Sequence, residues 1–222
     1  MALFRGPNIV TDGLVLALDA ASERSYPGTG TSWYDLSGSG YTHSLIGSPA
    51  YTTIDGAVCF NMGVSGAHAR PTSSTYTLPT NFTYTGWARI LADSQTTSWR
   101  TLWRPTPSDH VILVQDATNL IGFYDNNSAG FVSYGLNVGT MGIENVWTLY
   151  TVVASSVTST LYINDNEYSG SVPYTAAGNN HYNFPYPSQP FGYVASTMIY
   201  SRALSTTEIS QNFNAQKSRF GL

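Results

Sequence analysis

The sequence predicts an all-β protein, a sandwich of two antiparallel sheets with one short helix near the C-terminus. Short segments rich in β-branched and aromatic residues recur along the chain with turn residues between them, as in sandwiches. Only 10% of the 222 residues are charged, against about 25% in a typical globular domain. Gly, Ser, Thr, Asn and Tyr take their place. A helical pattern follows the last strand.

The first predicted strand covers residues 13–19, where three leucines occupy alternate positions and share one face. A loop with four glycines follows at residues 26–40, and we expect Trp33 and Leu36 to anchor it to the domain. The same kind of pattern predicts strands at 57–61, 81–91, 99–104, 110–114, 120–124, 146–154 and 159–164.

Residues 172–190 contain four prolines and four aromatic residues, and we interpret them as an ordered loop. The next segment, residues 193–200, alternates between two faces, one of which carries Val194, Met198 and Tyr200. This period of two predicts a strand that is covered on both sides.

A short helix is predicted after this strand. Ser205 and Glu208 have the spacing of a capping box, in which each side chain accepts a hydrogen bond from the other residue's backbone N–H. Leu204 and Ile209 have the spacing of a hydrophobic staple. Gly221 is a good stop for the helical region.

Charge and composition exclude several classes of function. The net charge is −4 and the basic residues form no cluster, which argues against nucleic-acid binding. The apolar runs are too short to span a bilayer, so no membrane partner is expected. The N-terminus lacks the pattern of a signal peptide. Cys59 is the only cysteine, which rules out an internal disulfide, and we interpret it as a small buried hydrophobe.

Both ends of the chain resemble one protein family. The run IYSRALSTTEI at 199–209 resembles the closing signature of laminin-G-like domains with the concanavalin A-type jelly roll. Residues 13–45, which begin GLVLALDA, and the tail QNFNAQKSRFGL at 211–222 resemble the branch found in structural proteins of tailed bacteriophages. The resemblance implies one concanavalin A-like jelly-roll domain at 13–222, preceded by an N-terminal arm at 1–12.

The family that the resemblance names includes glucanases, whose catalytic carboxylates lie in the motif E-x-D-x-x-E. Retaining glycosidases need two carboxyl groups about 5–5.5 Å apart. The four glutamates, Glu23, Glu144, Glu167 and Glu208, include no two that are five residues apart. The sequence therefore predicts a protein that is not an enzyme, with no catalytic residues. The four histidines are scattered, so no metal site is predicted either.

A carbohydrate site needs aromatic platforms beside amides and carboxylates. Trp99, Trp103, Tyr124, Asp125 and Asn127 form such a site if residues 99–104 and the turn at 124–128 share one end of the sandwich. The alternative is that the two tryptophans are packing residues.

Two turns are rich in the oxygen ligands that Ca²⁺ prefers. They lie at 124–128 and 164–167. We favour the alternative that Asp and Asn occur in both turns because they suit hairpin turns, and no cofactor is predicted.

Two functions are compatible with these observations. The first is a non-enzymatic structural protein of a phage virion, a capsid decoration or a fibre, tail or baseplate appendage, with other virion proteins as partners. The alternative is a carbohydrate-binding lectin module that attaches to host or environmental glycans.

The neutral surface and the apolar arm further predict a homo-oligomer, a trimer in preference to a dimer. The arm or the 172–190 loop would then lie in a contact between subunits. The alternative is a monomer whose arm folds back over one sheet.

Overall fold

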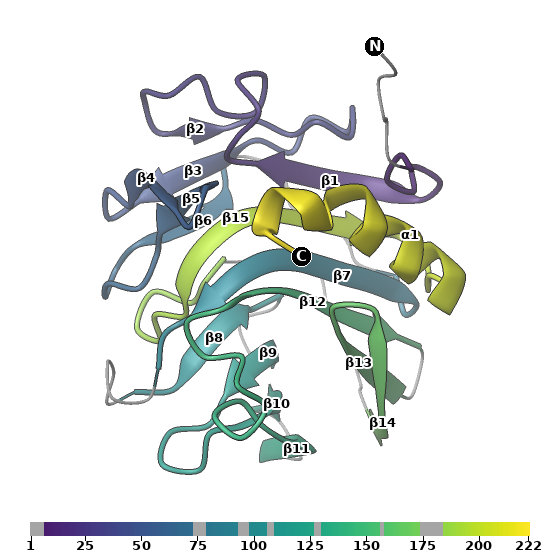
Figure 1. Ribbon diagram of the computed structural model, residues 1–222. Helices are drawn as coiled ribbons and strands as arrows, with labels where there is room; N and C mark the ends of the chain where they lie inside the picture. Colours follow the sequence, from purple (N-terminus) through teal and green to yellow (C-terminus); the bar gives the residue numbers. More distant parts are fainter. Residues whose placement is uncertain are drawn as a thin grey trace.

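The computed structural model describes residues 7–72, 79–92, 98–105, 109–126, 130–155, 158–173 and 184–222. Over these residues the protein is an antiparallel β-sandwich with one α-helix near the C-terminus, as predicted (Figure 1). No helix in these ranges is long and apolar enough to cross a membrane.

One layer of the sandwich is an eight-stranded sheet. The last strand of the chain, which precedes the helix, lies in the interior of this sheet. Its order is β14-β13-β12-β7-β15-β5-β4, and β1 also pairs with β15. The strands are β1 (Leu14–Asp19), β4 (Ala50–Ile54), β5 (Ala57–Asn61), β7 (Phe82–Ile90), β12 (Trp147–Ala154), β13 (Thr158–Ile163), β14 (Asn166–Pro173) and β15 (Gly192–Tyr200).

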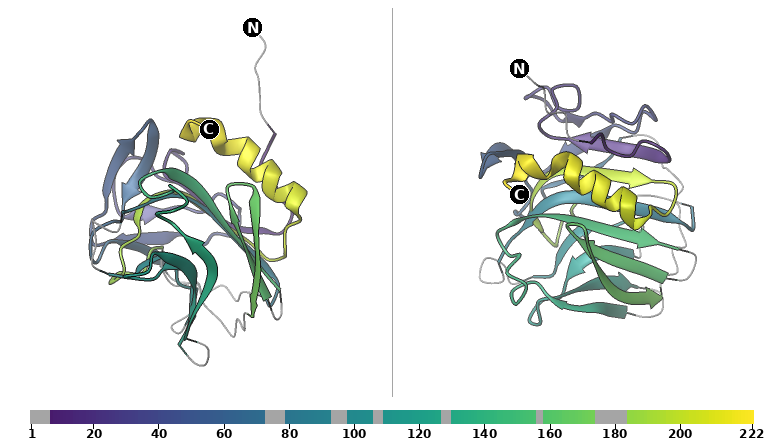
Figure 2. Two further views of the ribbon diagram at one scale, coloured as in Figure 1. Left: turned by 60° about the horizontal axis from the view of Figure 1, so that its bottom comes forward. Right: turned by 45° about the vertical axis from the view of Figure 1, so that its right-hand side comes forward.

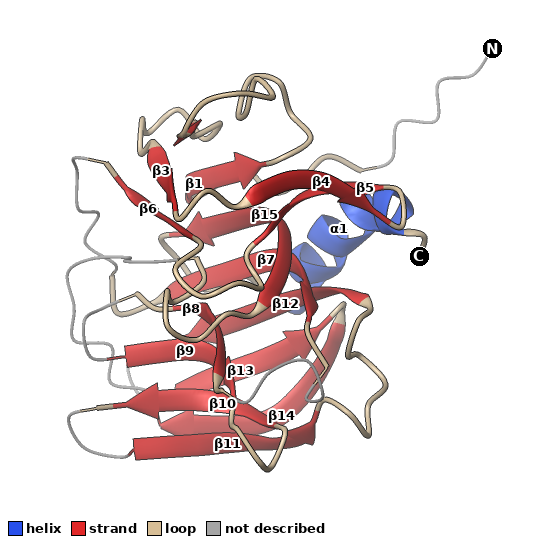
Figure 3. Ribbon diagram, turned by 90° about the vertical axis from the view of Figure 1, so that its left-hand side faces the viewer, coloured by secondary structure: helices blue, strands red, loops and turns tan. Residues whose placement is uncertain are grey.

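The facing layer is divided into two smaller sheets rather than one (Figure 3). A four-stranded sheet has the order β11-β10-β9-β8, and a three-stranded sheet has the order β2-β3-β6. The strands are β2 (Ser32–Trp33), β3 (His43–Ile46), β6 (His68–Pro71), β8 (Arg100–Trp103), β9 (Asp109–Val114), β10 (Leu120–Asp125) and β11 (Gly130–Asn137).

The main hydrophobic core lies between these layers and draws on all three sheets. At its centre the ring of Trp103 stacks on Tyr84, with centroids 4.6 Å apart, and on Phe184, 6.2 Å away. Trp33 is fully buried in the same core and Leu36 packs against a second cluster, so both residues anchor the glycine-rich loop as predicted. Cys59 is buried, also as predicted, and its burial raises the pKa of the thiol to about 11.

Helix α1 (Thr206–Gln216) lies on the outer face of the large sheet (Figure 2). The predicted capping box is present: the Glu208 N–H donates to Ser205 Oγ over 3.4 Å, and the Ser205 N–H donates to Glu208 Oε2 over 2.9 Å. Leu204 and Ile209 share one buried cluster, which confirms the staple. A 3₁₀ turn over Lys217–Phe220 extends the helix and ends at Gly221, whose φ of +76° suits glycine.

Two β-bulges change the faces that simple alternation predicts. In β15 the register shifts between Val194 and Ser196, so Val194 joins the main core while Met198 and Tyr200 lie under the helix. In β1 a shift between Leu14 and Leu16 separates Leu14 from the other two leucines in the same way. The predicted side assignments were wrong at Val194 and Leu14, because each bulge adds one unpaired residue.

The described part of the predicted N-terminal arm, residues 7–12, packs on its own domain. Val10 is buried beneath the helix, its N–H donates to Asn212 Oδ1 over 2.8 Å, and its carbonyl accepts from the Tyr200 hydroxyl over 3.0 Å. Ile9 packs against the same cluster. Ile9 and Val10 of the arm therefore pack within their own domain, over one face of the large sheet.

Candidate functional site: an aromatic hollow on the four-stranded sheet

A hollow of about 270 Å³ opens on the side of the four-stranded sheet that faces away from the core. Phe123 points into the core, so its neighbour Tyr124 points outward. His110 lies directly opposite Tyr124 across the β9–β10 ladder and therefore shares its face. The residues that line the hollow are Trp99, His110, Leu113, Tyr124, Asn126 and Gln189.

Two aromatic contacts fix the orientation of Trp99 at the rim of this hollow. Its ring is nearly perpendicular to that of Tyr124, at 83° and 5.6 Å, and to that of Phe131, at 85° and 5.3 Å. Edge-to-face contacts of this kind favour a single geometry. Trp99 and Tyr124 are both half-buried, so part of each ring remains accessible.

A short chain of hydrogen bonds forms the polar side of the hollow. The Thr101 hydroxyl donates to Gln189 Oε1 over 2.5 Å and lies 3.0 Å from His110 Nδ1. Because that hydroxyl has only one proton to give, His110 Nδ1–H donates to it. The other ring nitrogen, Nε2, is then left as an acceptor in the neutral imidazole.

The surroundings of His110 keep its ring neutral. Burial and, to a smaller extent, the positive charge of Arg104 together lower the pKa of His110 from 6.5 to about 4. The Arg104 guanidinium lies over the Tyr186 ring, 4.1 Å from its centroid, and Tyr186 in turn packs edge-on against His110. The hollow therefore offers an acceptor nitrogen and aromatic rings at neutral pH.

The structure brings together two of the five residues predicted from sequence, Trp99 and Tyr124. The prediction was wrong for Trp103, which is completely buried in the core. Its strand has a register shift between Thr101 and Trp103, which turns Trp103 to the inner face.

The other two predicted residues lie elsewhere. Asp125 follows Tyr124 along β10 and therefore points to the opposite face of the sheet. Its side chain is buried, with 8% exposed, and it does not line the hollow. Asn127 lies outside the described residues.

Sequence reasoning missed His110, Thr101 and Gln189. Pairing the predicted strands at 110–114 and 120–124 as a hairpin would have placed His110 beside Tyr124, since residues opposite each other share a face. Gln189 comes from the proline-rich segment at 172–190, of which residues 172–173 and 184–190 are described, and no local pattern links it to this sheet.

No group of three or more His, Cys, Asp or Glu side chains with metal-binding geometry occurs in the described ranges. In the turn at 164–167, Asn164 adopts a φ of +60° and its Oδ1 accepts a hydrogen bond from the Leu149 N–H. Glu167 accepts one from the Tyr162 hydroxyl. These contacts fit a hairpin turn. Of the other oxygen-rich turn, at 124–128, residues 127 and 128 lie outside the described residues.

No protein-family model and no curated protein matches this chain. Among solved structures, it is similar to a mutant of Trypanosoma rangeli sialidase with trans-sialidase activity, with a TM-score of 0.67, 15% identity and coverage of 96% of this chain and 35% of that one. It is also similar to the botulinum neurotoxin serotype D ligand binding domain in complex with N-acetylneuraminic acid, with a TM-score of 0.66, 16% identity and coverage of 93% and 52%.

A third similar structure is the binding domain of Paraclostridial Mosquitocidal Protein 1, with a TM-score of 0.64, 16% identity and coverage of 92% of this chain and 52% of that one. The chain thus spans between a third and about half of the length of the chains it matches. At these identities the shared property is the fold, and the fold is the lectin-like jelly-roll sandwich that the sequence predicts.

Proposed function

We propose that this chain is a carbohydrate-binding module, and that the hollow between Trp99 and Tyr124 holds the sugar. The observation that carries the proposal is that two partly accessible aromatic rings, Trp99 and Tyr124, line one hollow together with the imidazole of His110. Carbohydrates present apolar C–H faces next to hydroxyl groups. Aromatic faces suit the C–H groups, and acceptors suit the hydroxyls.

The volume of the hollow limits the size of the ligand that it can bind. Its volume, about 270 Å³, lies just below the range of about 300–1,000 Å³ of sites for drug-sized ligands. A single ring, such as the terminal unit of a glycan, is the matching size. Asn126 and Gln189 supply amide groups at the edge of the hollow for further hydroxyls.

Two of the similar structures support the proposal. One carries N-acetylneuraminic acid in a ligand binding domain of the same fold, and the other is the binding domain of Paraclostridial Mosquitocidal Protein 1. We propose a binding role without catalysis, because three of the four glutamates already serve other contacts: Glu144 pairs with Arg100, Glu167 accepts from Tyr162, and Glu208 caps the helix.

The virion location that the resemblance implies has no support among the similar structures, and it remains a proposal. It is compatible with glycan binding, because an appendage of a virion can carry a lectin module.

The test is a glycan array screen followed by isothermal titration calorimetry of the glycans that bind. Tyr124→Ala and Trp99→Ala are each expected to weaken binding about tenfold, since each removes an aromatic face that contacts the sugar. Tyr34→Ala is the matched control, because Tyr34 is an exposed tyrosine that does not line the hollow.

The control variant should bind like the parent. Retained affinity in both Tyr124→Ala and Trp99→Ala, or no bound glycan at millimolar concentration, would overturn the proposal.

A further inference from the structure

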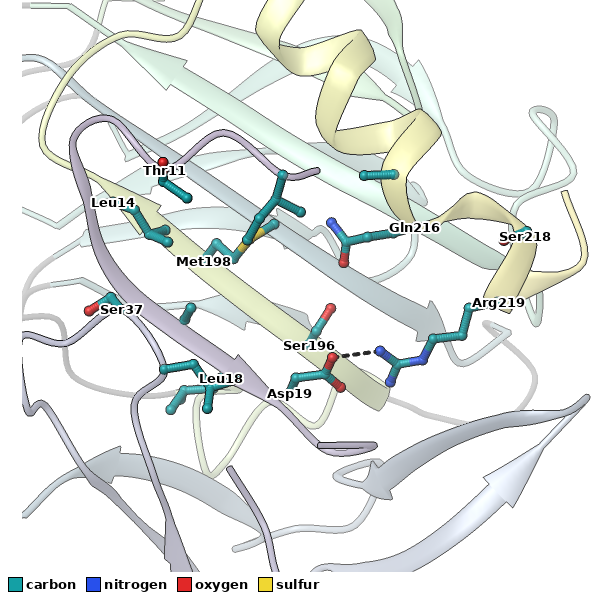
Figure 4. A pocket seen from close by; sticks show the side chains of 14 residues that line it. Thr11, Leu14, Leu18, Asp19, Ser37, Ser196, Met198, Gln216, Ser218 and Arg219 are labelled. Carbon is teal, nitrogen blue, oxygen red and sulfur yellow. Dashed lines mark hydrogen bonds and ion pairs between the residues drawn. The ribbon is translucent and has the colours of Figure 1, made fainter. Parts of the chain in front are cut away.

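A second and larger cavity, of about 440 Å³, lies under the C-terminal helix (Figure 4). Strands β1 and β15 form its floor, the end of α1 and the following 3₁₀ turn form one wall, and the N-terminal segment forms another. Thr11 and Ser218 at its rim are exposed, so the cavity reaches solvent. Its volume falls in the range of about 300–1,000 Å³ typical of small-molecule sites.

One end of this cavity is apolar. Ile9, Leu14, Leu36 and Met198 line it, and Figure 4 shows Leu14 and Met198 side by side. Ile9, Leu14 and Leu36 are only partly buried by the protein itself. Covering them with an alkyl chain would remove further apolar surface from water, which favours binding.

The other end carries hydrogen-bonding groups with unused capacity. Ser196 is 3% exposed, and its Oγ has no hydrogen-bond partner in the structure. A buried hydroxyl without a partner is unfavourable, so a ligand that bonds to it gains affinity. The Gln216 side chain donates through Nε2 to the Asn212 carbonyl over 3.2 Å, and Figure 4 shows its carbonyl oxygen directed into the cavity.

The charges at this end cancel each other. Asp19 and Arg219 are the charged residues among those that line the cavity, and Arg219 Nη1 lies 2.7 Å from Asp19 Oδ2. A charged ligand would have to leave water and also compete with this pair, which is unfavourable. The lining therefore selects a neutral ligand.

We infer that this cavity binds a small neutral amphipathic molecule. Its alkyl chain lies against Leu14, Leu36 and Met198, and its hydroxyl end bonds to Ser196 Oγ and to the carbonyl oxygen of Gln216. This site is independent of the proposed glycan site, because the two cavities share no lining residue.

Titration of the full chain with 1-octanol, followed by two-dimensional NMR of the backbone amides, tests the inference. Saturable shifts are expected at residues around the cavity, such as Ser196 and Gln216. Octanoate and octylammonium, which have the same chain length, are expected to bind at least tenfold more weakly. Tighter binding of either charged probe would overturn the assignment of a neutral ligand.

Two variants on neighbouring helix positions locate the ligand. Ala215→Phe places a phenyl ring in the cavity and is expected to abolish octanol binding. Asn214→Phe adds a phenyl ring at an exposed position of the same helix and should leave binding unchanged. If Ala215→Phe binds octanol as the parent does, or if both variants lose binding equally, the inference fails.

Ser196→Ala tests the hydrogen bond without filling the cavity. It is expected to weaken octanol binding about three- to tenfold, the effect of losing one hydrogen bond. If Ala215→Phe does not fold, Ser196→Ala still tests the inference. An octanol affinity equal to that of the parent would then refute the proposed hydroxyl position. Tyr124→Ala should bind octanol normally, which separates this site from the proposed glycan site.

Discussion

Acidification is expected to destabilise this fold through His43, which is fully buried in strand β3. Its Nδ1 lies 2.9 Å from the Tyr41 carbonyl oxygen, so Nδ1–H donates to that carbonyl in the neutral ring. The ring packs against Phe184, with centroids 5.5 Å apart. Burial lowers the pKa of His43 from 6.5 to about 4, and the Tyr41 carbonyl and Asp35 oppose this effect only in part.

The sign and size of the effect follow from proton linkage. Between pH 6.5 and 4 the unfolded chain holds a proton on this histidine and the folded chain does not, so stability falls as the pH falls. A pKa difference of about 2.5 corresponds to about 3 kcal/mol in total and about 2 kcal/mol between pH 7 and pH 5. Domains have a total stability of only about 5–15 kcal/mol.

Urea unfolding, followed by tryptophan fluorescence at pH 7, 6 and 5, measures this effect in the parent and in His43→Asn. The Asn side chain can still donate to the Tyr41 carbonyl but does not titrate. The free-energy difference between parent and variant should change by about 2 kcal/mol between pH 7 and pH 5, because His68 and His110 contribute equally to both proteins. Parallel pH profiles would refute the reasoning.

Three further outcomes are expected. Ser205→Ala should lower the unfolding free energy by about 1 kcal/mol, whereas Thr206→Ala, one residue into the helix, should leave it unchanged; equal urea midpoints for parent and Ser205→Ala would contradict the capping role. Trp103→Ala should lower the unfolding free energy by about 3–5 kcal/mol, because it leaves a cavity in the core. Thermal unfolding would detect this loss, and Trp99→Ala should not show it. Multi-angle light scattering should give the mass of a homo-oligomer, with a trimer expected, and a monomer mass would count against this prediction.

Local interactions explain why the end of the chain could be predicted from sequence. The capping box of Ser205 and Glu208 and the staple of Leu204 and Ile209 join residues three to five positions apart, so their spacing is visible in the sequence. The strands at 57–61, 120–125 and 147–154 also agree with the prediction within one residue, because burial on at least one face imposes a period of two.

Two strands at edges of the sheets, β4 and β11, were not predicted. Strand β4, whose side chains are exposed or half-buried, reads AYTTI, and β11 has no fully buried residue except Tyr134. Most of their side chains are exposed or half-buried, so burial leaves little periodic pattern in these two segments, and their hydrogen bonds to neighbouring strands stabilise them.

The difference between Trp99 and Trp103 shows what only the tertiary structure decided. Strict alternation puts both tryptophans on one face, and the bulge after Thr101 sends Trp103 into the core while Trp99 stays at the rim of the hollow. Similarly, Gln189 accepts a hydrogen bond from the Thr101 hydroxyl, although the two residues are 88 positions apart in the chain. The sequence by itself determined the β-sandwich class and its capped helix, because those depend on local periodicity. The composition of the site depends on single-residue register shifts and long-range contacts, whose energies arise only when the sheets pack together.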